Sequence, residues 1–113
     1  PRGMTVIYEL REYVAHAEMA EKLHRRFADH TFELFRRHGL TLVHFWTDPA
    51  RPERIVYLLV FDSQEQRDTA WAAFQADPDW KAVKAASEAD GPVLASSSSS
   101  LLREAPYWKP DAR

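Results

Sequence analysis

Four of the five histidines in this 113-residue sequence recur at a spacing that places them on one side of a helix. We place Phe27 toward the core of a helix over residues 17–39, with about 100° per residue. The apolar stripe is then completed by Ala20, Leu23 and Leu34. The histidines that lie within about 60° of this stripe are His16, His24, His30 and His38. Imidazoles there could act as general bases near neutral pH, so we expect His24 or His30 to line a cleft, unless both only bridge core and solvent.

Aromatic side chains form a second set of candidate ligand-binding groups. A cleft for a flat aromatic or polyketide-like substrate could be lined by Tyr8, Trp46, Tyr57, Trp71 and Trp80. His44 would share a strand face with Trp46, and Tyr57 could join the histidines in proton transfer. The alternative is that the tryptophans belong to the core and to a dimer interface.

Charged residues could bind an anionic group of a ligand. Arg67 lies in the first turns of an expected helix, where it could bind a carboxylate or phenolate of a substrate or pair with Glu9 or Asp62. Glu9 and Arg11 share a face of the first expected strand. We expect these two residues to form an ion pair, because a lone buried charge is too costly.

Composition excludes several other classes of chemistry. The absence of cysteine rules out disulfides, a thiolate nucleophile and a zinc–thiolate site. No HxxxH pair occurs, so we expect no metal. With only three glycines and no glycine-rich loop, we expect no phosphate cradle and no cofactor. A formal net charge of −2 argues against a nucleic-acid partner.

The sequence also carries no membrane or export signal that we recognise. No apolar run approaches the roughly 20 residues that a membrane span requires. No positively charged leader precedes an apolar segment, and the lack of cysteine suits a reducing compartment. We therefore expect a cytoplasmic protein with no membrane partner. The first three residues, "PRG", resemble the remnant of an expression tag, so we expect one domain over residues 4–108.

The elements that must position these residues follow from hydrophobic periodicity and from breakers. We expect strands at residues 5–14, 40–48, 54–62 and 92–104, and helices at residues 17–39, 62–78 and 77–91. This β-α-β-β-α-β order predicts an α+β, ferredoxin-like fold with a four-stranded antiparallel sheet and helices on one face. The third strand is apolar on both faces and should be central.

A run of five serines, Ser96 to Ser100, lies inside the last expected strand. Such a run is also typical of a linker, but the fold needs a fourth strand and no other segment can supply it. Small hydroxyl side chains would leave room above the sheet. Either Trp71 or Trp80 fills this room, or serines such as Ser98 form the floor of a cavity.

Several segments resemble the NIPSNAP family of the dimeric α+β barrel superfamily. They are "IYELREY", "HFWTD", "IVYLLVFDSQEQRDTAWAAFQADPDWKAV" and "SLLREAPYW", and the resemblance covers nearly all of residues 6–108. It implies a homodimer with its sheets face to face and a cleft between sheet and helices in each subunit. Relatives use this cleft for cofactor-free oxidation of aromatic substrates, haem degradation, dehydration, isomerisation or binding alone. Tyr57 departs from the family pattern, which often has His there, and "DWKAVKAASEADG" lacks the ligand His of haem-degrading relatives.

Together these observations predict a homodimeric α+β barrel that binds a small aromatic or conjugated, polyketide-like molecule. The candidate catalytic residues are His30, His24 and Tyr57, and the candidate substrate-binding residues are Tyr8, His44, Trp46, Arg67, Trp71 and Ser98. The reaction would be a cofactor-independent isomerisation, cyclisation or oxidation. The alternative is a non-catalytic ligand-binding or protein-interaction module, and the sequence leaves open whether the protein is an enzyme.

Overall fold

A computed structural model describes residues 5–110, and its elements follow the expected order. The strands are β1 (Ile7–Ala15), β2 (Thr41–Asp48), β3 (Arg51–Phe61) and β4 (Leu94–Leu102). The helices are α1 (Ala20–Arg26), α2 (Phe32–His38), α3 (Gln64–Ala76) and α4 (Pro78–Ser87), with a 3-10 turn η2 (Ala17–Met19) and a π-helix η3 (Phe27–Thr31). The tag remnant expected at residues 1–3 lies outside the described residues.

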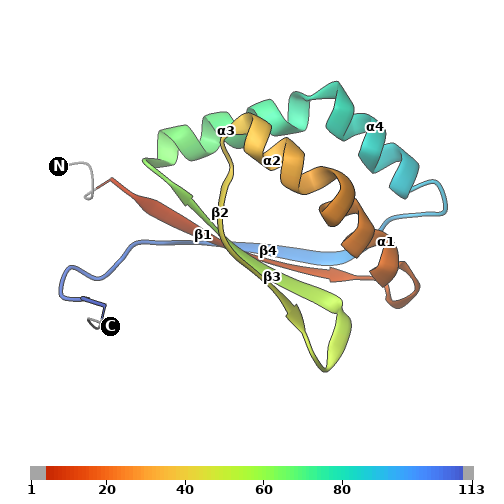
Figure 1. The fold of residues 1–113 in the computed structure, drawn as a ribbon, viewed down its shortest axis with the longest axis horizontal. Coiled ribbons are helices and arrows are strands. Elements are labelled where there is room, and N and C mark those ends of the chain that lie inside the picture. The colour runs from red at the N-terminus through yellow and green to blue at the C-terminus, as the bar shows by residue number, and fades with distance from the viewer. Residues whose placement is uncertain (1–4, 111–113) are drawn as a thin grey trace.

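The four strands form one antiparallel sheet in the order β2-β3-β1-β4, and the helices lie together on one side of it (Figure 1). The predicted α+β, ferredoxin-like fold is therefore confirmed, and β3 is a central strand as expected. The serine run is part of strand β4, which pairs with β1, so the linker interpretation is wrong. None of the described helices is long and apolar enough to cross a membrane.

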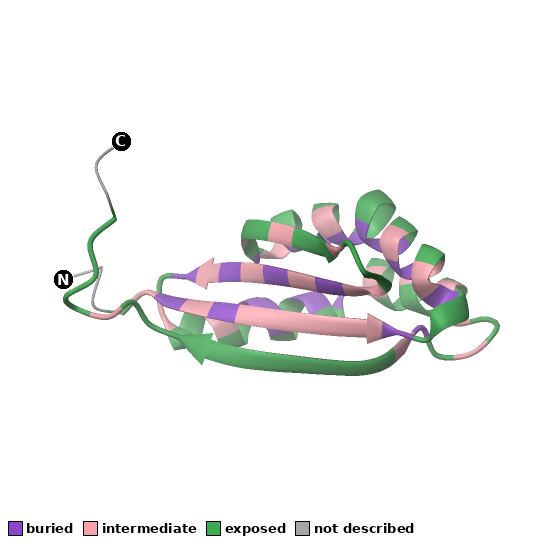
Figure 2. Cartoon of the chain, turned by 90° about the horizontal axis from the view of Figure 1, so that it is seen from below, coloured by how far each residue is buried: buried purple, intermediate pink, exposed green. Residues whose placement is uncertain are grey.

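Side chains alternate between the two faces of the sheet. In β3, the fully buried Ile55, Tyr57 and Leu59 point to the helices, and buried and half-buried residues alternate along the strand (Figure 2). In β1, Ile7 and Glu9 are buried on the same side. This side of the sheet and the facing helices enclose the hydrophobic core.

The opposite face, which we call the outer face, carries a different set of apolar residues. Its half-buried members are Tyr8, Leu10, Val14, Val56, Leu58 and Val60. Two other apolar side chains on this face are more exposed, Trp46 at 45% and Leu102 at 47%. No described element of the chain covers this face, so its apolar side chains are open to a partner.

The first helical segment is not one continuous α-helix. The π-helix η3 separates α1 from α2, and the hydroxyl of Thr31 donates a hydrogen bond of 3.2 Å to the carbonyl oxygen of Arg26. A π-helix turns fewer degrees per residue than an α-helix. It therefore carries His30 farther from the buried stripe, and His30 is exposed whereas Thr31 is buried. The expectation of a buried-side His30, which assumed uniform α-helical periodicity, is wrong.

The second helical segment begins and ends at side-chain caps. The hydroxyl of Ser63 accepts a hydrogen bond from the backbone N–H of Gln66, and the Gln66 side chain accepts one from the N–H of Asp62. Asp77 ends this helix and caps α4 by accepting from the N–H of Asp79. His38 lies 2.6 Å from the same Asp77 carboxylate, so this histidine joins α2 to the α3–α4 corner.

Candidate functional site

The cavity between the sheet and the helices has a volume of about 620 Å³. Its walls are largely aromatic, with rings from Tyr13, Phe27, Phe35, Trp71, Phe74 and Trp80. Polar atoms enter it from Arg11 and Ser97 on the sheet and from Arg26 and Thr31 on the first helical segment. The cavity therefore combines flat apolar walls with a few charged and polar groups, which is typical of a small-molecule site.

The carboxylate of Glu9 is fully buried and contacts Arg11 and Trp71 of the cavity wall. Arg67 donates to it twice, with Nε 3.0 Å from Oε1 and one terminal nitrogen 2.8 Å from Oε2. Arg11 donates at 2.9 Å and the indole nitrogen of Trp71 at 2.7 Å. The hydroxyl of Ser99 donates at 2.5 Å. The predicted Glu9–Arg11 pair is present, and of the partners considered for Arg67 the structure pairs it with Glu9.

These hydrogen bonds determine the ionisation of Glu9. Burial alone would raise the pKa of the Glu9 carboxyl. The bonds from Arg67, Ser99, Trp71 and Arg11 outweigh burial and lower the pKa to about 2. Glu9 is thus an anion at neutral pH, and it fixes the positions of Arg11 and Trp71 on the cavity wall.

A chain of hydrogen bonds runs from the buried Tyr57 to the cavity. The Tyr57 hydroxyl lies 2.8 Å from the hydroxyl of Tyr13, and a terminal nitrogen of Arg11 lies 3.2 Å from the same Tyr13 oxygen. Burial raises the pKa of Tyr57 well above its ordinary value. Tyr57 therefore stays protonated, and it reaches the cavity through Tyr13 rather than by lining it.

Arg26 enters the cavity from the end of α1 and is only 6% exposed. One terminal nitrogen donates to the Ser87 hydroxyl at 3.1 Å, and the guanidinium lies 5.2 Å from the ring centre of Trp80. Burial lowers the pKa of Arg26, outweighing the opposite effect of Glu88. Among the described residues, the buried Nε atoms of Arg26 and Arg11 have no hydrogen-bond partner.

Two residues of the cavity wall, Tyr13 and Arg26, are not among the candidates predicted from the sequence. Strand alternation places Tyr13 on the same face as Glu9 and Arg11, and this signal could have identified it. Arg25 and Arg26 look equivalent in the sequence, yet Arg25 is exposed and pairs with Glu21. Only the packing of the helix on the sheet distinguishes them.

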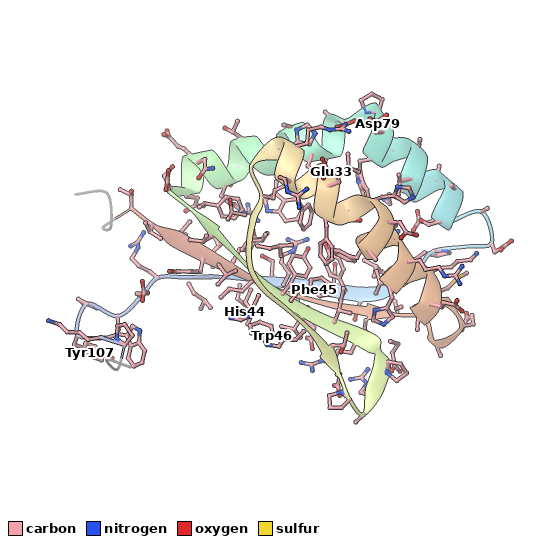
Figure 3. The ribbon with its side chains drawn as sticks, in the orientation of Figure 1. Glu33, His44, Phe45, Trp46, Asp79 and Tyr107 are labelled. Atoms are coloured by element: carbon pink, nitrogen blue, oxygen red, sulfur yellow. The ribbon has the colours of Figure 1, made fainter. Side chains whose placement is uncertain are left out.

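The sheet separates the candidate residues into two groups. Tyr57, Arg67 and Trp71 lie on the helix side, whereas Tyr8, His44, Trp46 and Ser98 lie on the outer face. Figure 3 shows His44 and Trp46 on the side of the sheet away from the helices, where their rings stack with centres 5.2 Å apart. A single cleft that joins Tyr8 and Trp46 to Tyr57 is therefore excluded, because adjacent strand positions face opposite sides.

The two candidate histidines do not line the cavity either. A ring nitrogen of His24 lies 2.7 Å from the carbonyl oxygen of Pro52, so His24 joins α1 to the start of β3. His30 is exposed beside α4, where it borders surface grooves with Ala82 and Val83. The expected histidine wall is instead formed by Arg26 and Phe27. Among residues 5–110, no cluster of three metal-binding side chains occurs.

The protein has an α+β fold with a cavity between its sheet and its helices, and a family model identifies its family. The NIPSNAP model matches residues 8–109, so the chain belongs to the NIPSNAP family. No curated protein is a significant match to the sequence.

Solved structures show the same fold. A NIPSNAP-like domain protein from Burkholderia xenovorans is 20% identical with a TM-score of 0.78, over 93% of this chain and 90% of that one. A NIPSNAP family protein of unknown function from Agrobacterium tumefaciens is 21% identical with a TM-score of 0.77, over 92% of both chains. A putative antibiotic biosynthesis monooxygenase from Bacteroides thetaiotaomicron is 14% identical with a TM-score of 0.62, over 98% of both chains.

Proposed function

We propose that this protein binds a small aromatic or conjugated molecule in the cavity between the sheet and the helices. The observation that carries the proposal is the cavity of about 620 Å³ with six aromatic side chains, the buried Arg26 and the half-buried Arg11 in its walls. Volumes of roughly 300–1,000 Å³ are typical of small-molecule sites. Flat walls favour a planar ligand, because ring faces and edges pack well against one another.

The finer form of the proposal is a cofactor-independent isomerisation, cyclisation or oxidation of a polyketide-like substrate. Support comes from the structural neighbour named as a putative antibiotic biosynthesis monooxygenase. The Tyr13 hydroxyl, which Tyr57 and Arg11 hold by hydrogen bonds, offers a proton donor at the cavity wall. A non-catalytic binding protein would use the same cavity, and turnover of a bound compound separates the two functions.

We also propose that two copies form a homodimer through their outer faces. A sheet with helices on one side has to bury its other apolar face, and a two-fold pair of identical faces is a common solution. In this arrangement, Tyr8, His44, Trp46 and Ser98 belong to the interface or to the space between the sheets rather than to the cavity.

The neighbouring serines of β4 allow a matched test of cavity binding. Ser97 lines the cavity, whereas Ser98 points to the outer face. A panel of aromatic acids and phenols is screened for compounds that raise the melting temperature of the wild type. Ser97→Phe fills part of the cavity and should reduce this rise, and Ser98→Phe should preserve it. A panel without any stabilising compound, or an equal effect of both variants, would contradict the proposal.

A further inference from the structure

Arg26 is a buried cation without a carboxylate partner among the described residues. Its side chain has one hydrogen bond, to the neutral Ser87 hydroxyl, and its Nε has none. Removing a guanidinium from water costs several kcal/mol unless an anion compensates for it. The chain therefore holds a charge in the cavity wall that its own residues do not neutralise by direct contact.

Arg11 also has N–H groups that make no hydrogen bond to the described residues. Glu9 is shared by Arg11 and Arg67, and Arg67 also pairs with Asp68, so Arg11 shares its only carboxylate partner with a second guanidinium. The guanidinium of Arg11 lies 4.5 Å from the ring centre of Trp71, and its buried Nε has no partner among residues 5–110. Its terminal nitrogens each make one hydrogen bond, to Glu9 and to Tyr13, so each keeps a second N–H for a group in the cavity that Arg11 lines.

The charges along the cavity have mostly the same sign. Four cations line it, Arg11, Arg26, Lys81 and Lys84; against them stand the lining carboxylate of Glu88 and the Glu9 carboxylate that pairs with Arg11, which leaves a net charge of +2. The whole chain has a formal net charge of −2. The positive cavity is therefore a local feature, and low-dielectric walls strengthen its attraction for an anion.

Tyr13 supplies a further donor. The proton of the fully buried Tyr57 hydroxyl has the Tyr13 oxygen as its acceptor, and Arg11 can only donate to that oxygen. The Tyr13 oxygen therefore accepts two hydrogen bonds. Its own proton is not needed within this group and is available to a ligand in the cavity that Tyr13 lines.

We propose that the cavity selects an aromatic carboxylate, whose anionic group is bound by Arg26 and Arg11 and accepts a hydrogen bond from Tyr13. This inference rests on the proposed function, because it names the ligand class of the same cavity. The aromatic part of the ligand lies against the rings of Trp71 and Trp80, beside the two guanidinium groups. The neutral amide of the same ring system should bind more weakly, since it leaves the buried Arg26 without an anion.

The test uses 2-naphthoate and its neutral isostere 2-naphthamide as probes in isothermal titration calorimetry. We expect the wild type to bind 2-naphthoate at least about tenfold more tightly than 2-naphthamide, as is typical of charge-assisted hydrogen bonds. Tyr13→Phe should weaken 2-naphthoate binding by roughly three- to tenfold, the range for one lost hydrogen bond.

Arg26→Met makes the test sharper, with Arg25→Met as the matched control on the exposed side of the same helix. Arg26→Met should weaken 2-naphthoate binding by about tenfold or more and leave 2-naphthamide binding unchanged. It should also raise the melting temperature of the ligand-free protein, because an apolar side chain replaces a buried charge without a carboxylate partner. A purely structural Arg26 would show a lower melting temperature. Arg25→Met should change neither affinity.

The outcomes separate this inference from the proposed function. Equal binding of the two probes by the wild type would overturn the carboxylate inference and leave cavity binding intact. Unchanged 2-naphthoate binding in Arg26→Met would do the same. Absence of binding for both probes would overturn the carboxylate inference. Cavity binding would then be tested separately, by comparing Ser97→Phe with Ser98→Phe in the presence of the remaining compounds of the panel. The comparison of the two probes needs only the wild type, so it holds even if a variant fails to fold.

Discussion

The indole nitrogen of Trp71 donates a hydrogen bond of 2.7 Å to the carboxylate of Glu9, which lies 62 residues away in the sequence. This contact joins helix α3 to the central strand β1. It also ties an aromatic wall of the cavity to the anion that holds Arg11 and Arg67 in place. Core stability and cavity geometry therefore depend on the same buried carboxylate.

The low pKa of Glu9 predicts a specific pattern of acid sensitivity. Its pKa falls from an ordinary 4.5 to about 2 in the folded state, so its contribution is complete above pH 4.5 and is lost as the pH falls through 2. The size of this contribution is on the order of 3 kcal/mol. Glu9→Gln should therefore lower the free energy of unfolding at pH 7, and its difference from wild type should shrink toward pH 2 in urea titrations.

An exposed carboxylate provides the control for this experiment. Glu21 pairs with Arg25 at the surface, where both side chains are about three-quarters exposed. Glu21→Gln should change the free energy of unfolding by less than about 1 kcal/mol. A stability difference between Glu9→Gln and wild type that stays constant from pH 7 to pH 2 would show that the charge of Glu9 does not contribute.

The homodimer is tested by mass and by a charge on the outer face. Sedimentation equilibrium at micromolar concentration should give twice the chain mass of 13.1 kDa. Leu58→Lys places a cation in the centre of the apolar outer face and should shift the protein to monomer, because a buried lysine without a partner is costly. Ala72→Lys, at an exposed position of α3, should remain dimeric. A wild type that sediments as a monomer would refute the interface.

Strand β4 should show a distinctive pattern of amide exchange. It lies at the edge of the sheet and pairs with β1 alone among the described strands. Amides between Leu94 and Leu101 that point to β1 should exchange slowly, and those that point away should exchange faster unless a second subunit covers them. Rapid exchange at every serine in deuterium-exchange NMR would be incompatible with an ordered strand.

Most of the fold could be predicted because its signals are local. Breakers and periodicity predicted the order of strands and helices, and this order alone required a last strand within residues 92–104, where the structure has β4 at Leu94–Leu102. Strand alternation also placed Glu9 and Arg11 on one face, where they pair. Residues two apart in a strand lie on the same face, so ion pairs of this kind can be predicted from their spacing in the sequence.

The cavity was harder to predict because it depends on which face the helices cover. Alternation shows which residues share a face but does not say which face is covered, so Tyr8 and Trp46 were grouped with Tyr57 across the sheet. Because of the π-helix, His30 lies outside the buried stripe. No residue type in residues 27–31 indicates a π-helix in the sequence. Arg26 becomes distinctive only through tertiary burial.

The most direct test of cavity binding follows the four tryptophan indole N–H signals in a ¹H–¹⁵N spectrum during titration with 2-naphthoate. Trp71 and Trp80 line the cavity, whereas Trp46 lies on the outer face and Trp108 is 58% exposed beyond β4. Single Trp→Phe variants assign each signal. We predict saturable shifts of the Trp71 and Trp80 signals with those of Trp46 and Trp108 unchanged. Shifts confined to Trp46 or Trp108 would contradict binding between the sheet and the helices.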